Sequence, residues 1–190
     1  FGWSGTVSAD GEAATRTIQR GDMSYVVTDL VEADYQEYYN GFANRALWPL
    51  FHHRPGLTEF ARREMAGYYR VNQIFARILA PMVQPDDIIW VHDYHLIPLA
   101  AELRALGCRN RIGFFLHIPM PPPLIFAAIP QHAWLMQCLF AYDLTGFQTE
   151  ADLDHFTRYA LTEGGAQALD DGRLRAGGRT LQAGAFPIGI

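Results

Sequence analysis

The sequence predicts an α/β domain in which a parallel sheet is flanked by helices. Apolar runs at residues 88–91, 112–116 and 144–147 are continuous rather than alternating, as in strands that are buried on both faces of a parallel sheet. From residue 86 onward, stretches of helical character separate these runs, and such alternation favours a parallel sheet. The chain has 190 residues, of which 49% are hydrophobic, so it is long enough for one compact core.

The first part of the chain has weaker patterns. Residues 6–21 are polar and contain the turn signals Asp10-Gly11 and Gly21-Asp22, so we expect a surface loop that leads to a short strand at residues 24–28. Residues 29–44 are acidic and then aromatic. We expect them to be helical after their start.

The clearest helix is predicted at residues 58–79, because apolar side chains recur there at helical spacing and Thr58 is a plausible N-cap. The apolar segment 47–51, interrupted by a proline, is expected to be a packed turn. A second helix is expected at residues 95–106, before Gly107.

Toward the end of the chain, helices are expected on either side of the 144–147 strand. The glycine-rich residues 164–178 predict a hairpin or a mobile loop. Residues 179–190 are expected to return to a strand. Both ends of the chain read like the interior of a fold, so we expect truncation at both ends.

Charge and composition exclude several classes of partner. The formal net charge is −5, with 15 basic residues, all of them arginine. No basic stripe is present, so we expect no nucleic-acid partner, although a few arginines can still hold a small phosphorylated substrate.

Cys108 and Cys138 match no metal or redox spacing and are expected to be free thiols in a reducing compartment. No apolar run has the length of about 18 residues that a membrane span needs, and we expect a cytoplasmic protein without a signal peptide.

Two polar segments follow neighbouring strands of the predicted sheet. Residues 92–95 follow the run at 88–91, and residues 117–121 follow the run at 112–116. Ligands of open parallel sheets bind at the carboxyl ends of the strands. We therefore expect the two segments to face one cleft.

Asp93 is the strongest candidate in this cleft. A carboxylate can accept two hydrogen bonds from sugar hydroxyls, but Asp93 can equally be the N-cap of the helix that follows. His92, Asp93 and His95 also resemble a metal-ligand cluster. We expect no metal, because His92 and Asp93 point to opposite faces of an extended segment and no third ligand follows at helical spacing.

His117 is the second candidate. It could orient a substrate or donate to a developing charge, or it could be a core histidine with its hydrogen bonds satisfied. Pro119 and residues 121–123 stiffen the loop that follows. Such a loop suits a preorganised site, but it also suits a rigid crossover.

Aromatic residues form a third candidate group, made up of Trp3, Tyr38, Tyr39 and Trp48. Aromatic faces pack against the apolar faces of sugar rings. Composition alone favours a place in the core for most of them. Nothing in the pattern distinguishes Tyr39 from Tyr38.

Eight segments, taken in order, carry a more specific signal. They are Phe1–Gly5, Tyr38–Asn44, Leu47–Pro49 with Phe51-His52, Gly67–Asn72, Asp87–Leu96, Arg111–Pro119, Tyr142–Thr149 and Pro187–Ile190. In order and spacing they resemble the trehalose-6-phosphate synthase family of retaining GT-B glycosyltransferases.

The resemblance implies that residues 1–190 are a partial N-terminal, Rossmann-like acceptor-binding domain and that the C-terminal nucleotide-sugar domain is absent. It implies glucose transfer from UDP-glucose, or a related nucleotide glucose, to glucose 6-phosphate, with no cofactor and no metal. Tyr39, Trp48 and Asp93 are then acceptor contacts, and Trp3 lines the same pocket. His117 and Ile118 lie near the donor glucose. Asp93 and His117 are the implied catalytic residues. The resemblance is also compatible with homo-oligomerisation of the full-length protein.

Other readings stay open at this stage. Relatives such as glucosylglycerol-phosphate synthases and pseudo-glycosyltransferases share the architecture. A non-catalytic sugar-phosphate-binding or regulatory domain, and a generic flavodoxin-like domain, are further alternatives. Leu124 departs from the family pattern, since many relatives carry an acidic residue there.

Overall fold

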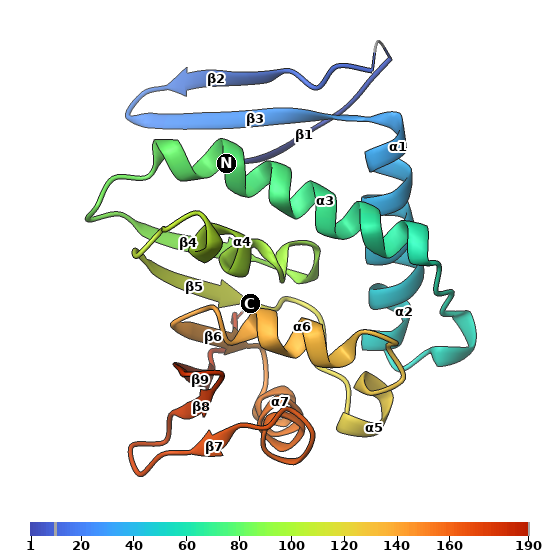
Figure 1. Ribbon diagram of the computed structural model, residues 1–190, viewed down its shortest axis with the longest axis vertical. Helices are drawn as coiled ribbons and strands as arrows, with labels where there is room; N and C mark the ends of the chain where they lie inside the picture. Colours follow the sequence, from blue (N-terminus) through green and yellow to red (C-terminus); the bar gives the residue numbers. More distant parts are fainter. Residues whose placement is uncertain (10, 190) are drawn as a thin grey trace.

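The computed structural model describes residues 1–9 and 11–189 and confirms an α/β fold with a parallel sheet (Figure 1). Asp10 of the first turn signal and Ile190 of the closing motif lie outside these residues. One sheet has the order β1-β3-β2 and the other has the order β4-β5-β6-β9-β8-β7. The strands of the first sheet are β1 (Gly2–Ser8), β2 (Thr15–Arg20) and β3 (Met23–Val31); those of the second are β4 (Ile88–His92), β5 (Arg111–Phe115), β6 (Leu144–Phe147), β7 (Gln167–Ala168), β8 (Leu174–Ala176) and β9 (Arg179–Ala185).

The second sheet contains the three strands that the apolar runs predict. β4, β5, β6 and β9 pair in parallel, whereas β7 and β8 pair antiparallel beside β9. The hairpin expected within residues 164–178 is therefore confirmed. β9 ends at Ala185, so the strand expected at 179–190 is shorter than predicted.

The expectation of a loop at residues 6–21 is wrong, because this segment contributes to β1 and β2. Every residue of β2 is exposed, so no apolar alternation marked it as a strand. β2 pairs with β3 through backbone hydrogen bonds, with Arg20 opposite Met23. Gly21-Asp22 is thus a two-residue hairpin turn, and Gly21 has the positive φ of 57° that such turns require.

The expected turn at 47–51 is also wrong, since the chain is helical from residue 32 to residue 51. The helices there are α1 (Glu32–Asp34), the π-helix η1 (Tyr35–Leu47) and α2 (Trp48–Phe51). Pro49 in α2 has no N–H to donate, and the Arg45 carbonyl four residues before it accepts instead from the Glu59 backbone N–H at 3.0 Å. Gly41 breaks the helical geometry with φ −75° and ψ −107°, and a Cβ there would lie 2.8 Å from the Gln36 carbonyl oxygen.

The helix predicted at 58–79 is confirmed as α3 (Arg62–Leu79), but its N-cap is Ala61 rather than Thr58. Thr58 instead closes a short 3₁₀ turn, η2 (Pro55–Leu57), by donating its backbone N–H to the Pro55 carbonyl. The remaining helices are η3 (Ala80–Met82), η4 (Tyr94–Leu96), α4 (Leu99–Ala105), α5 (Pro123–Phe126), α6 (His132–Leu139) and α7 (Glu150–Thr162). The helix expected at 95–106 is thus divided into η4 and α4.

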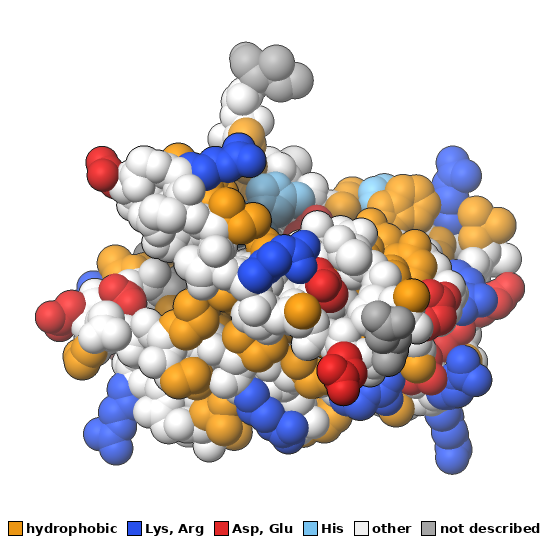
Figure 2. All heavy atoms as spheres, turned by 90° about the horizontal axis from the view of Figure 1, so that it is seen from above, with side chains coloured by type: hydrophobic (Ala, Val, Ile, Leu, Met, Phe, Trp, Pro, Cys, Tyr) orange, Lys and Arg blue, Asp and Glu red, His pale blue; other side chains and the backbone are white. Residues whose placement is uncertain are grey.

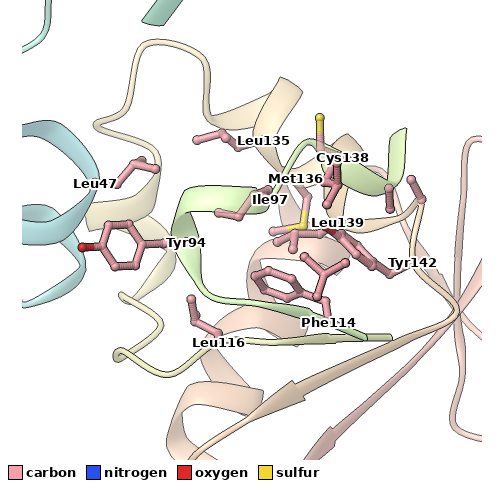
Figure 3. Packing of buried hydrophobic residues seen from close by; sticks show 14 of the residues in the cluster. Leu47, Tyr94, Ile97, Phe114, Leu116, Leu135, Met136, Cys138, Leu139 and Tyr142 are labelled. Atoms are coloured by element: carbon pink, nitrogen blue, oxygen red, sulfur yellow. The ribbon is translucent and has the colours of Figure 1, made fainter. Parts of the chain in front are cut away.

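The core lies between the sheet and the helices α3, α4 and α6, which cover one face of the parallel strands (Figure 1). Phe114 of β5 packs there on Tyr142, with ring centroids 5.0 Å apart, among side chains from η4 and α6 (Figure 3). β5 is buried on both faces as predicted. β4 is not: its residues alternate, and Ile88 and Trp90 are 72% and 46% exposed, because β4 is an edge strand of this sheet.

Ion pairs hold α1 and η1 against α3. Arg70 of α3 donates to Asp34 at 2.5 Å and to Glu37 at 2.8 Å, and both carboxylates are buried. A Cβ on Gly67 would lie 2.2 Å from the Cβ of Glu37, so the two helices approach closely at this glycine. These contacts fix η1, which carries Tyr39, relative to the rest of the fold.

Candidate functional site

The carboxyl ends of β4 and β5 meet at one edge of the sheet, as predicted. The strands pair in parallel, with His92 opposite Phe115. Asp93, the next residue, donates its backbone N–H to the Phe115 carbonyl at 2.8 Å. Its carboxylate accepts hydrogen bonds from the backbone N–H of Tyr94 at 3.0 Å and of His117 at 3.3 Å. Asp93 therefore joins the two polar segments directly.

The backbone of Asp93 is strained, with φ 72° and ψ 166°. A residue with a side chain pays about 1–3 kcal/mol to occupy this region, and such residues cluster at functional sites. The Asp93 carboxylate also caps the short helix η4, so the prediction that Asp93 is an N-cap is confirmed. A cap alone does not explain the strain, because an N-cap ordinarily has unstrained, extended backbone angles.

His117 lies against a second histidine. Its Nε2 is 2.9 Å from Nδ1 of His92, and the two rings stack with centroids 5.1 Å apart. Both histidines face an otherwise apolar cavity of about 250 Å³, which is lined by Trp90, His92, Phe115, His117, Leu144, Phe186 and Ile188. Burial lowers the pKa of His92, and the nearby His117 lowers it further, while Asp93 acts in the opposite direction.

Trp3 and Tyr39 come together as an aromatic group with His95. Trp3 of β1 packs on Tyr39 of η1 at 5.0 Å between ring centroids, and Tyr39 stacks on His95 of η4 at 5.3 Å. His95 in turn packs on Tyr94 at 4.0 Å. The group therefore reaches from the first sheet to the residue that follows Asp93.

The structure distinguishes Tyr38 from Tyr39, which the sequence pattern did not. Tyr38 is 3% exposed and belongs to the core, whereas Tyr39 is only partly buried. The hydroxyl of Tyr94 points toward η1 (Figure 3) and donates to Asn44 Oδ1 at 2.8 Å. This bond ties the kinked helix to the turn after Asp93.

Trp48 and Ile118 occupy other positions. Trp48 is 43% exposed and packs on His52, with ring centroids 4.2 Å apart, rather than joining the stack of Trp3 and Tyr39. Ile118 is partly buried directly after His117. Contacts thus link the segments of Asp93, His117 and Tyr39, whereas Trp48 is set apart on α2. The cavity at His117 is not lined by Asp93, Tyr39 or Trp48, so the hollow expected between these residues stays a prediction.

Comparison with known proteins decides the family. The model of glycosyltransferase family 20 matches residues 1–190. The chain belongs to this family. A relative described as trehalose-6-phosphate synthase, from Sinorhizobium fredii, is 54% identical over 191 residues, which cover 100% of this chain and 41% of that protein.

Solved structures of the family agree with this fold. An α,α-trehalose-phosphate synthase (UDP-forming) from Burkholderia xenovorans, in complex with glucose-6-phosphate, matches with a TM-score of 0.95 and 46% identity, over 99% of this chain and 42% of that one. An E. coli structure bound with UDP-2-fluoro glucose matches with a TM-score of 0.94 and 43% identity, over the same shares of the two chains. The chain thus spans about two fifths of the length of these relatives.

Sequence reasoning did not predict the contacts of three residues near Asp93 and His117. His92 was considered only as a metal ligand. His95 was considered as a metal ligand and, at the start of a helix, as a structural residue, and Asn44 was not singled out as a site residue. The alternation of β4 could have placed His92 on the same face as Trp90, opposite to Asp93. Asn44 carried no such signal, because its contact with Tyr94 depends on the path of η1.

Residues 1–9 and 11–189 contain no group of three or more histidine, cysteine, aspartate or glutamate residues that could hold a metal ion. None of their helices combines the length and the apolarity needed to cross a membrane. On the face in Figure 2, arginine and acidic side chains are interspersed rather than gathered into a patch of one sign.

We expect the free energy of unfolding of this chain to fall as the pH drops below about 6.5, the ordinary pKa of histidine. Burial lowers the pKa of His95, with Asp93 in part opposing, and its Nε2 has no hydrogen-bond partner among the described residues. At pH values between the lowered pKa of the folded state and the ordinary pKa of the unfolded state, His95 binds a proton only in the unfolded state. Acidification over this range therefore favours unfolding. Below the lowered pKa the loss levels off.

Urea unfolding at a series of pH values between about 5 and 7.5 measures this effect. His95→Phe keeps a ring in the stack and removes the titrating group, so its unfolding free energy should depend less on pH. His92 contributes to the pH dependence that remains in the variant, because its pKa is lowered too. Equal slopes for the variant and the wild type would contradict a neutral, partly buried His95.

Proposed function

We propose that this chain is the acceptor-binding part of a retaining trehalose-6-phosphate synthase, which transfers glucose from UDP-glucose to glucose 6-phosphate. The observation that carries the proposal is Asp93, which has a strained backbone and a carboxylate held at the ends of β4 and β5. Structures of similar proteins with glucose-6-phosphate and with a UDP-glucose analogue support the two substrates.

The acceptor sugar lies, in this proposal, between Asp93 and the aromatic group of Trp3 and Tyr39. The tyrosine and tryptophan faces suit the apolar face of a pyranose ring. The Asp93 carboxylate accepts the acceptor hydroxyl and orients it, and such positioning can supply much of a rate enhancement. Trp48, which is exposed on α2, contacts the same sugar from the side open to solvent.

The donor glucose lies on the other side of Asp93, near His117 and Ile118. The bond between the anomeric carbon and the diphosphate oxygen breaks, and a new bond forms from that carbon to the acceptor oxygen on the same face. The acceptor proton passes to the departing diphosphate. No side chain forms a covalent intermediate, and no cofactor or metal takes part.

We also propose that residues 1–190 make up most of the N-terminal domain of a longer, two-domain protein. The support is that the chain covers only about two fifths of its relatives. The second domain then supplies the groups that hold the nucleotide. We place the full-length protein in the cytoplasm, without nucleic-acid or membrane partners, and homo-oligomerisation of that protein is part of the same proposal.

The acceptor assay tests the proposal. The full-length protein is expected to release UDP from UDP-glucose with glucose 6-phosphate as acceptor, and to use glycerol 3-phosphate at least about tenfold less efficiently by kcat/KM. Residues 1–190 alone should give no turnover, because half of the cleft is missing. Preference for glycerol 3-phosphate would assign a glucosylglycerol-phosphate synthase instead. Binding of glucose 6-phosphate without turnover would indicate a regulatory protein.

A further inference from the structure

His92 makes a contact that the roles above leave unexplained. It is the last residue of β4, and its Nδ1 lies 2.9 Å from Nε2 of His117 across the strand ends. A hydrogen bond between two neutral imidazoles needs one N–H and one free lone pair. The state of one ring therefore dictates the state of the other.

The exposed residue His117 is held through its backbone and through its ring. Its backbone N–H donates to the Asp93 carboxylate at 3.3 Å, and its ring packs on Phe115 with centroids 4.8 Å apart. His92 is itself packed edge-on against Trp90, at 5.8 Å. Of the side chains that line the cavity around the two histidines, His92 is the one that hydrogen-bonds to the His117 ring.

We propose that His92 is a positioning residue that fixes the tautomer and orientation of His117, so that Nδ1 of His117 is the nitrogen left to meet a ligand. This inference rests on the proposed function, which assigns His117 to the donor sugar. A neutral histidine has one ring nitrogen that donates and one that accepts, and the hydrogen bond made by one nitrogen determines the role of the other. In this proposal the bond from His92 to Nε2 of His117 determines whether Nδ1 of His117 donates or accepts.

The electrostatics agree with this role. Burial and the neighbouring His117 lower the pKa of His92, against the smaller opposing effect of Asp93. His92 is thus neutral near pH 7 and has a single ring proton to place. A doubly protonated pair would put N–H groups on both facing nitrogens and break the contact, so the neutral state of His92 preserves it.

The direct test is a long-range proton–nitrogen correlation spectrum of the full-length protein labelled with ¹⁵N only at histidine. In the wild type, His117 should show one tautomer, with well-separated nitrogen shifts. His92→Phe keeps the ring stack but loses the hydrogen bond, so His117 should show averaged shifts from two exchanging tautomers. His92→Asn places an amide near the former Nδ1 and should restore one tautomer. An unchanged His117 spectrum in His92→Phe would overturn the proposal.

Kinetics give the second test. His92→Phe should lower kcat/KM for the donor about tenfold while the KM for glucose 6-phosphate stays within about twofold, and His92→Asn should recover most of the loss. In a His117→Ala background, His92→Phe should have almost no further effect, because the two residues act as one unit. An equal loss in both backgrounds would overturn the proposal. If the wild type transfers no glucose, the proposed function fails, and the spectra still decide whether His92 sets the state of His117.

Discussion

Replacing Asp93 by alanine in the full-length protein is expected to lower kcat/KM at least tenfold, which corresponds to about 1.4 kcal/mol of lost transition-state binding. The carboxylate is the charged group at the point where β4 and β5 end, and it accepts from the backbone of both following segments. In the proposed function its loss removes the acceptor of the sugar hydroxyl, and it also removes the hydrogen bond from the His117 backbone N–H. Steady-state kinetics with both substrates measure the effect.

Two further substitutions at this position separate chemistry from folding. Asp93→Asn keeps an oxygen that can accept hydrogen bonds from the N–H groups of Tyr94 and His117. Its free energy of unfolding should therefore lie within about 1 kcal/mol of the wild-type value. Its activity should be nearly as low as that of the alanine variant. Asp93→Gly relieves the strain of φ 72° and should fold well without activity. Near-wild-type kinetics in Asp93→Asn would reduce Asp93 to a helix cap.

The largest effect on stability is expected from Phe114→Ala, at about 3–5 kcal/mol in the free energy of unfolding. Phe114 is 1% exposed, and it packs on Tyr142 in the centre of the core (Figure 3). Removing the ring loses its transfer free energy and leaves a cavity between β5 and the helices that cover it. This loss is a large share of the roughly 5–15 kcal/mol that stabilises most domains.

Urea or thermal unfolding of the chain measures this change. Leu124→Ala is the matched control, because Leu124 is 86% exposed and its truncation should change the unfolding free energy by no more than about 0.5 kcal/mol. Similar losses for the two variants would mean that the core is not centred on β5.

Sequence reasoning succeeded where burial imposes a pattern. The apolar runs at β5 and β6 marked buried strands correctly, and the position of Asp93 after β4 placed it at the edge shared with His117. Parallel pairing determines this edge, because strands that run the same way end at the same side. The pairing itself was predictable from the alternation of strands and helices.

Sequence reasoning failed where tertiary contacts decide. β2 is exposed throughout and exists because its backbone pairs with β3. The packing of Trp48 on His52 was not predicted, because it depends on the continuation of the helix into α2. The strain at Asp93 and the contact between His92 and His117 depend on atomic positions that no residue pattern encodes.

A crystal structure of the full-length protein with glucose 6-phosphate tests the central claim most directly. We predict a sugar hydroxyl within hydrogen-bond distance of the Asp93 carboxylate and the pyranose ring against Tyr39. Glucose 6-phosphate bound away from Asp93, for example at the arginine-lined cavity of Arg104, Arg109 and Arg179, would contradict the account.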